Sequence, residues 1–182
     1  MIKGDNIGLT AVFEEDIIQL MNWRNNENMR KFYREYKELN YQMQLKWFNE
    51  KVINDNSTIM FAIRDIKSGQ LLGCCGLCYI NWVHRNAEIS LYIGLDDAYI
   101  DKRAYEALRI LLRYGYEQIG MEKLWAECYD FDDKRIKMYK DFSFHLDGIL
   151  RNNYFYENGW HASEIYSLLA CEYLDLAKEN NI

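Results

Sequence analysis

The sequence predicts a single mixed α/β domain with a central, mostly antiparallel sheet flanked by helices. Segments with alternating apolar residues recur along the chain, which is typical of strands that are buried on one face. Between them lie stretches with apolar residues three and four positions apart, which is typical of helices. A chain of 182 residues, 49% of them hydrophobic, is long enough for one core, and no repeat or linker divides it. We therefore expect one domain over residues 1–182.

The first half of the chain is expected to contain a strand, two helices and three further strands. The segment NIGLTAVF alternates, and the segment after it has Ile17, Leu20 and Met21 at helical spacing. The segments TIMFAIRD and QLLGCCGLCYI flank the turn IKSGQ and predict a hairpin. The expected elements are a strand at 6–13, helices at 14–29 and 40–55, and strands at 58–65, 70–80 and 86–94.

The second half contains the clearest element, a helix over residues 104–119. Its stripe of apolar residues includes Leu108 and Leu111, whereas Arg109 and Arg113 lie largely outside that stripe. Gly120 is well placed to end the helix. The remaining expected elements are a strand at 123–130, a short helix at 132–142 and a long hairpin at 144–174 that turns at residues 157–159.

Composition excludes several classes of partner. The formal net charge of −6 and the pI near 5.2 argue against a broad nucleic-acid surface. No run approaches the ~18 apolar residues of a membrane span, and the N-terminal segment lacks the apolar core of a signal peptide. Five cysteines, an odd number, fit reduced thiols in the cytoplasm. We expect a cytoplasmic protein that binds neither nucleic acid nor membrane.

Three of the cysteines, Cys74, Cys75 and Cys78, cluster in the segment GCCGLC. A metal site is the sharper interpretation, but neither a second cysteine pair nor a histidine at ligand spacing follows. Small residues in a tightly packed strand explain the cluster better. We therefore expect no metal site.

The loop before the clearest helix resembles a phosphate-binding connection that lacks glycine. Such loops bring backbone N–H groups close to a phosphate at a helix N-terminus, and glycine makes that approach easier. Here no glycine occurs between Gly94 and Gly115. Four acidic and two basic side chains leave two net negative charges around the loop, and Asp101 can cap the helix itself. The acidic residues are Asp96, Asp97, Asp101 and Glu106, and the basic residues are Lys102 and Arg103.

The order of the elements, over nearly the whole chain, resembles the GNAT (GCN5-related) N-acetyltransferase family. The segments WRNNENMR, QLKWFNE and NAEISLYIG resemble the branch with ribosomal-protein, polyamine and amino-sugar N-acetyltransferases. WAECYDFDDKRIKMYKDFSF and YFYENGWHASEIYSLL resemble that branch's strand-helix segment and its last hairpin. The resemblance implies a sheet with splayed middle strands and direct acetyl transfer from acetyl-CoA to an amine.

The resemblance also implies which residues bind the cofactor. When the loop is aligned with the family pattern Gln/Arg-x-x-Gly-x-Gly/Ala, only Ala104 fits. Either side chains replace the backbone contacts that the missing glycines would allow, or Asp101 has closed the phosphate site. The strand before the loop would pair with the pantetheine arm. In the 132–142 helix, Asp132 stands at the family's asparagine and Arg135 at its serine. The implied cofactor-binding residues are Leu91, Tyr92, Ile93, Tyr99, Lys102, Arg103, Ala104, Tyr105, Asp132 and Arg135.

Two residues are candidates for proton transfer. Tyr139 matches the family tyrosine whose hydroxyl protonates the departing CoA thiolate, although it can also be a packing residue three positions from Ile136. Glu88 is the best candidate base for the attacking amine, and an exposed ion-paired strand glutamate is the alternative. The histidines at positions 84, 145 and 161 are further alternatives.

The acceptor site in such folds is built from the first two helices and the last hairpin. The segment RKFYREYKE is basic and aromatic, which suits a nucleotide-linked amino sugar, whereas a polyamine would prefer an acidic cleft. A protein N-terminus, or a solvated helix end at a homodimer contact, also fits. The residues chosen for substrate binding are Trp23, Arg24, Tyr33, Arg34 and Trp160. The competing function is a non-catalytic module of the same fold that no longer binds acetyl-CoA.

Overall fold

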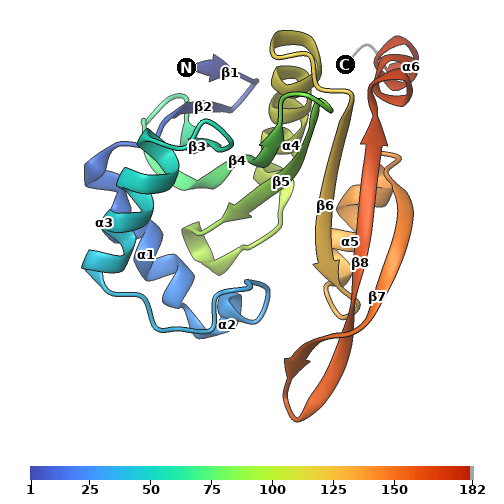
Figure 1. The fold of residues 1–182 in the computed structure, drawn as a ribbon. Coiled ribbons are helices and arrows are strands. Elements are labelled where there is room, and N and C mark those ends of the chain that lie inside the picture. Colours follow the sequence, from blue (N-terminus) through green and yellow to red (C-terminus); the bar gives the residue numbers. More distant parts are fainter. Residues whose placement is uncertain (181–182) are drawn as a thin grey trace. The chain divides into compact units, whose positions relative to one another are not determined.

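A computed structural model describes the backbone of residues 1–180 and the side chains through residue 176 (Figure 1). The chain forms two compact units. Unit 1 comprises residues 1–79 and 90–111, and unit 2 comprises residues 80–89 and the chain from residue 112 onward. Two strands, β4 (Leu71–Asn81) and β5 (Asn86–Ile93), contribute residues to both units. The single domain over residues 1–182 stays a prediction.

The strands follow the hydrogen-bonded order β1-β2-β3-β4-β5-β6-β8-β7. The pairs β1–β2, β2–β3, β3–β4, β6–β8 and β7–β8 are antiparallel, and β5–β6 is parallel. This pattern confirms the expected mixed α/β class with a mostly antiparallel sheet.

Unit 1 holds the N-terminal strands and most of the helices. The helix expected over 14–29 is interrupted, because Asn26 adopts an extended backbone (φ −61°, ψ 123°) and its side chain accepts a hydrogen bond from the N–H of Asn28. A short N-terminal strand was not predicted. The elements of unit 1 are β1 (Ile2–Lys3), β2 (Ile7–Ala11), α1 (Ile17–Asn25), α2 (Glu27–Arg30), α3 (Tyr41–Trp47), β3 (Ile59–Asp65) and α4 (Lys102–Arg113, reaching two residues into unit 2).

The helix α4 confirms the apolar stripe read from the sequence. Ala104, Ala107, Leu108 and Leu111 are fully buried. The helix starts two residues earlier than expected, because Asp101 precedes it and accepts a hydrogen bond from the N–H of Arg103. After residue 113 the helix widens into a π turn, and Gly120, at φ +67°, follows its end.

Unit 2 is built on a long hairpin, drawn in orange and red in Figure 1. The hairpin turns through Glu157 and Asn158, both at positive φ, as a two-residue turn between right-twisted strands requires. The hairpin expected over 144–174 ends at Leu169, because Glu172 accepts a hydrogen bond from the Leu169 N–H and Tyr173 stacks on Tyr116. The elements of unit 2 are β6 (Lys123–Tyr129), α5 (Asp133–Asp141), β7 (His145–Tyr156), β8 (Gly159–Leu169) and α6 (Ala170–Asn180).

The cysteine cluster lies inside β4. Cys74 and Cys75 are buried, and burial raises the pKa of the Cys74 thiol to about 12. Within the described part of the chain, no group of three or more His, Cys, Asp or Glu residues is arranged to hold a metal ion. The helices described also include none long and apolar enough to cross a membrane.

A buried ion pair ties the segment before α1 to β3. Both carboxylate oxygens of Asp16 lie 2.7 Å from Nη2 of Arg64, and Oδ2 also accepts a hydrogen bond from the N–H of Phe13. Asp16 is 5% exposed. Removing its charge would leave the Arg64 guanidinium largely desolvated without its counter-ion.

We expect Asp16→Asn to lower the free energy of unfolding by ~2 kcal/mol, measured from urea denaturation. The matched control is Glu50→Gln, which breaks the exposed pair of Lys46 and Glu50 and should cost less than ~0.5 kcal/mol. Equal losses for the two variants would contradict a stabilising role for the buried pair.

Candidate active-site residues

The loop between β5 and α4, residues 94–101 of unit 1, has a backbone that glycine would adopt more easily. Asp96, Asp97 and Tyr99 have φ of 59°, 51° and 56°. Such conformations are uncommon for residues with a Cβ and persist where the surroundings hold them. One restraint is the side-chain amide of Asn26, which donates to Oδ1 of Asp97 at 2.7 Å. The loop therefore keeps left-handed turns without glycine.

Tyr99 holds this loop by its backbone and by its ring. Its N–H and C=O exchange hydrogen bonds of 2.9 Å with the C=O and N–H of Ile93, and its ring stacks on Phe32 at 4.2 Å. The backbone of Ile93 is therefore engaged at the end of β5. A ligand can bond the N–H of Ile93 only if this bridge opens. The cofactor contacts expected of Ile93 and Tyr99 stay predictions.

Asp101 occupies the start of α4. Its Oδ1 accepts a hydrogen bond from the Arg103 N–H at 2.8 Å, and its backbone C=O accepts from the N–H groups of Ala104 and Tyr105. The guanidinium of Arg103 contacts Asp101 Oδ2 at 2.7 Å and Asp96 at 3.5 Å. The hydrogen bond that Arg103 donates to the Asp101 carboxylate raises the pKa of Arg103. Asp101 therefore caps α4, as the sequence allowed, and whether side chains replace the lost backbone contacts with the cofactor stays a prediction.

Lys102 is the remaining basic residue of this helix start. Its side chain is exposed, and it makes no ion pair within residues 1–176. The backbone of Lys102 does not adopt positive φ, so the family's glycine is not needed there for its dihedral angles. Lys102 thus keeps an ammonium that can meet an anion.

The end of β5 in unit 1 is packed on both sides. Leu91 and Tyr92 are buried, and burial raises the pKa of the Tyr92 hydroxyl. A Cβ added at Gly94 would lie 1.9 Å from the ring of Trp23, so only glycine fits under that buried indole. Trp23 therefore has a packing role, and its expected contact with substrate stays a prediction.

Arg24 and Tyr33, both expected to bind substrate, lie together in unit 1. The Arg24 guanidinium is 5.4 Å from the centre of the Tyr33 ring, and its buried Nε has no hydrogen-bond partner among the described residues. The charge of Arg34 opposes the rise that burial causes in the pKa of Cys78. Nearby in the sequence, Arg30 pairs with Glu38 and with the C=O of Tyr36, so this arginine of the basic segment is neutralised locally.

In unit 2, α5 joins three of the predicted residues. Asp132 precedes the helix, and its Oδ1 accepts a hydrogen bond from the Arg135 N–H at 3.2 Å. Arg135 Nε lies 3.4 Å from Asp132 Oδ2, and Arg135 Nη1 donates to the Tyr139 hydroxyl at 3.3 Å. All three residues are buried, and Tyr139 is 0% exposed. The sequence predicted separate roles for residues that the structure connects.

Glu88 lies on β5 in unit 2, opposite Trp125 of β6 in the parallel register. It is 4% exposed, so the alternative of an exposed strand glutamate is wrong. A buried carboxylate in a strand is costly unless it has partners, and such residues are enriched at functional sites. Its role as a base stays a prediction.

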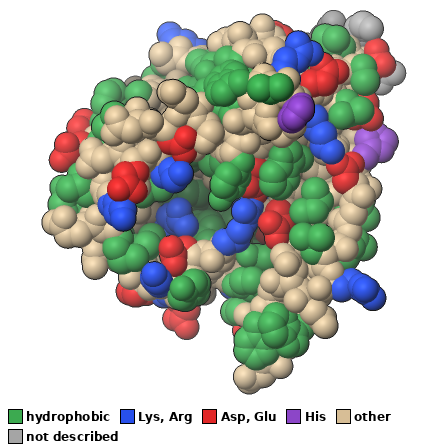
Figure 2. All heavy atoms as spheres, viewed as in Figure 1, with side chains coloured by type: hydrophobic (Ala, Val, Ile, Leu, Met, Phe, Trp, Pro, Cys, Tyr) green, Lys and Arg blue, Asp and Glu red, His purple; other side chains and the backbone are tan. Residues whose placement is uncertain are grey.

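The β7–β8 hairpin presents aromatic rings in two places. At its tip, Trp160 is 61% exposed and packs edge-on against Phe155 at 5.2 Å; Figure 2 shows hydrophobic side chains gathered there. A second group surrounds Phe131 beside the Asp130 carboxylate, which contacts Nδ1 of His161 at 3.1 Å. Its rings are Tyr129, Phe131, Tyr154, Tyr156 and His161.

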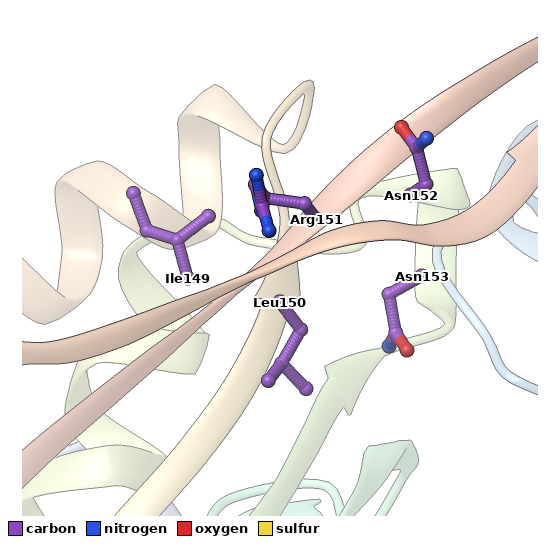
Figure 3. Close-up of a pocket in the computed structure, with 5 residues that line it drawn as sticks. All are labelled: Ile149, Leu150, Arg151, Asn152 and Asn153. Atoms are coloured by element: carbon purple, nitrogen blue, oxygen red, sulfur yellow. The ribbon is translucent and has the colours of Figure 1, made fainter.

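A pocket of about 690 Å³ lies along β7 and is lined by residues 149–153 (Figure 3). It occurs where the register with β8 shifts between Leu150 and Tyr154. Ile149 and Arg151 point to one side of the strand and Leu150 and Asn153 to the other. Among the described residues, those that line it carry no carboxylate, thiol or imidazole.

Comparison with known proteins identifies the family. Residues 6–144 match the family model described as "Acetyltransferase (GNAT) domain". Curated relatives include spermidine N(1)-acetyltransferases of Escherichia coli K12, 25% identical over 85% of this chain and 81% of that protein, and of Vibrio cholerae, 23% identical over 92% and 95%.

Solved structures share the fold. The V. cholerae spermidine N-acetyltransferase in complex with CoA and spermine has a TM-score of 0.86 and 22% identity, with 94% of this chain and 99% of that chain covered. A dodecameric structure of the V. cholerae enzyme in an intermediate state has a TM-score of 0.80 and 21% identity, covering 96% and 99%. At these identities the structures show a common fold. With the family model matched over residues 6–144, the chain belongs to the GNAT acetyltransferase family.

Proposed function

We propose that this protein transfers the acetyl group of acetyl-CoA to a primary amine of a polyamine such as spermidine. Enzymes of the GNAT family use acetyl-CoA as the acetyl donor. The observation that supports a polyamine as the acceptor is the match to spermidine N(1)-acetyltransferases over 81% to 95% of their own length. A structure of the V. cholerae relative holds CoA and spermine on the same fold.

The charges of the chain support a polycationic acceptor better than a nucleotide-linked sugar. The net charge of −6 attracts polycations over long range. The ring group around Phe131, beside Asp130, offers the aromatic faces and the carboxylate that an ammonium prefers. The sugar hypothesis needed arginines for phosphates, and Arg30 is already paired with Glu38. The nucleotide-linked sugar and the protein N-terminus are therefore not proposed as acceptors.

The proposed chemistry is direct transfer, with proton transfers by residues of unit 2. Glu88 takes a proton from the acceptor amine, and Tyr139 donates one to the departing CoA thiolate. A cysteine nucleophile is disfavoured at Cys74 and Cys75, because burial raises the pKa of both thiols and suppresses the thiolate. Proximity of amine and thioester supplies much of the rate.

Cofactor binding at α4 rests on side chains more than on backbone groups. Asp101 engages the N–H groups of Arg103, Ala104 and Tyr105, which in other GNAT members would face a pyrophosphate. Lys102 is exposed and is the cation we assign to a phosphate contact. Leu91, Tyr92 and Tyr105 remain proposed backbone or side-chain contacts of the cofactor.

We also propose that the protein associates with copies of itself. A solved relative is dodecameric, and the hairpin of unit 2 exposes several large apolar side chains. The exposed residues of the hairpin are Leu146, Ile149, Leu150, Phe155 and Trp160.

The proposed function is tested by incubating the protein with acetyl-CoA and spermidine. We expect acetylspermidine by mass spectrometry and stoichiometric release of CoA thiol. Acetyl-CoA at 100 times its Kd should also stabilise the fold by ~2.7 kcal/mol in thermal unfolding. A nucleotide-linked amino sugar serves as the comparison acceptor. Absence of a thermal shift at millimolar acetyl-CoA would refute the enzyme and favour the non-catalytic module.

Tyr139→Phe tests the proton donor. We expect kcat to fall by ~10²-fold with the Kd for acetyl-CoA nearly unchanged, because only the hydroxyl is lost. The control is Tyr166→Phe, which removes a neighbouring hydroxyl that donates to Glu164 instead. If Tyr139→Phe weakens binding or stability without slowing turnover, Tyr139 is a packing residue.

Asp101→Asn tests the cap at α4. Asparagine keeps an acceptor for the Arg103 N–H, so stability should change little. Loss of one negative charge should tighten acetyl-CoA binding by about fivefold at low salt, an effect that salt screens. Isothermal titration calorimetry at two salt concentrations measures it, with Asp65→Asn as a control in the β3–β4 turn. An unchanged or larger Kd would place the phosphates elsewhere.

A further inference from the structure

Resting on the proposed acetyl transfer, we propose that Arg135 is a positioning residue that holds the Tyr139 hydroxyl as a proton donor. This differs from the expected cofactor contact, in which the Arg135 side chain, standing at the family's serine, would meet a phosphate. Arg135 and Tyr139 are four residues apart on α5, so their side chains lie one helical turn apart on the same face.

The hydrogen bond between the two side chains fixes which way the phenol can donate. A guanidinium has donors and no acceptor, so in the 3.3 Å contact Arg135 Nη1 donates and the Tyr139 oxygen accepts. The hydroxyl hydrogen is then directed away from Arg135. Within the described residues it has no acceptor. A proton acceptor that arrives with the substrate can take that place.

Asp132 holds the guanidinium in this orientation. Its two oxygens contact the Arg135 backbone N–H at 3.2 Å and Nε at 3.4 Å. Asp132 is 2% exposed and Arg135 7%, so the pair is buried. Turning Arg135 toward a phosphate would break a buried ion pair, which is costly. The geometry therefore favours a fixed cation beside the phenol.

The environment of Tyr139 explains why a cation is useful there. Burial raises the pKa of its hydroxyl, and the charge of Arg135 and its hydrogen bond oppose that rise. Cys128 on β6 and Asp132 also raise the pKa of Tyr139. The rings of Phe144, just before β7, and of Tyr166, on β8, pack near the Tyr139 ring. A proton leaves a buried phenol more readily when a cation stabilises the phenolate that forms.

The step balances in protons and electron pairs. The amine nitrogen forms a bond to the acetyl carbon, and the C–S bond breaks with its electron pair on sulfur. The O–H bond of Tyr139 breaks as the S–H bond of CoA forms. The phenolate beside Arg135 then regains a proton from solvent, and the product amide has lost the amine proton to the base.

The test combines Arg135→Met with Tyr139→Phe in the full chain. We expect Arg135→Met to lower kcat about tenfold with the Kd for acetyl-CoA within about twofold, and Arg135→Lys to restore part of the rate. In the Tyr139→Phe background, Arg135→Met should cost less than about twofold more, since residues acting as a unit are not additive. Lys137→Met removes an exposed cation of the same helix and should leave kcat unchanged.

The pH profile supplies a readout that a purely structural role would not move. Because the Arg135 cation lowers the pKa of Tyr139, its removal should shift the alkaline limb of kcat to higher pH. Independent losses in the double variant would overturn the proposal. So would a tenfold weaker Kd at unchanged kcat, which would return Arg135 to a phosphate contact.

A second measurement covers the case in which Arg135→Met does not fold. Tyrosine labelled with carbon-13 at Cζ gives a Tyr139 resonance, assigned by its loss in Tyr139→Phe. Arg135→Lys should shift that resonance without any substrate, and an unshifted resonance would overturn the proposal. Wild-type turnover, measured first, reports separately on the proposed function.

Discussion

The buried pair of Asp132 and Arg135 is the interaction on which α5, and the proton transfer proposed for it, depend. A buried arginine is tolerated only with a counter-charge and hydrogen bonds, and Asp132 supplies both while it caps α5. The same cap fixes where the helix begins, and the candidate proton donor lies four residues, about one turn, after Arg135. That residue is Tyr139. The start of the helix, the buried charge and the candidate proton donor thus form one connected arrangement.

In unit 1, a second acidic helix cap uses the backbone N–H groups that a phosphate-binding loop would leave open. At α4, Asp101 uses the helix start for a carboxylate and for the pairing of Arg103, where a phosphate loop would present open N–H groups. The loop before it has left-handed turns at non-glycine residues, held by the Ile93–Tyr99 bridge. Backbone strain of this kind is concentrated where function requires a defined backbone.

Much of the fold follows from patterns that report burial. The stripe through Leu108 and Leu111 predicted α4 because a buried face repeats with the helix. The break at Asn26 and the start of α6 depend on single side-chain hydrogen bonds, which periodicity does not report. In the candidate site, sequence spacing places Tyr139 beside Ile136, three residues away. The informative partner was Arg135, four residues away, whose role depends on a charge being buried.

The opposite charges of the two proposed substrates connect these caps. Acetyl-CoA is anionic and the proposed polyamine acceptor is cationic, so one acidic protein must lower repulsion for the first while attracting the second. In unit 1, Arg103 offsets part of the charge of Asp96 and Asp101, and Glu106 is bound to backbone N–H groups of Asn6 and Ile7. Local pairing therefore reduces the negative field near α4 and leaves the long-range charge of −6 to act on the acceptor. On this reasoning, the acidic loop is compatible with a cofactor that binds through Lys102 rather than through backbone amides.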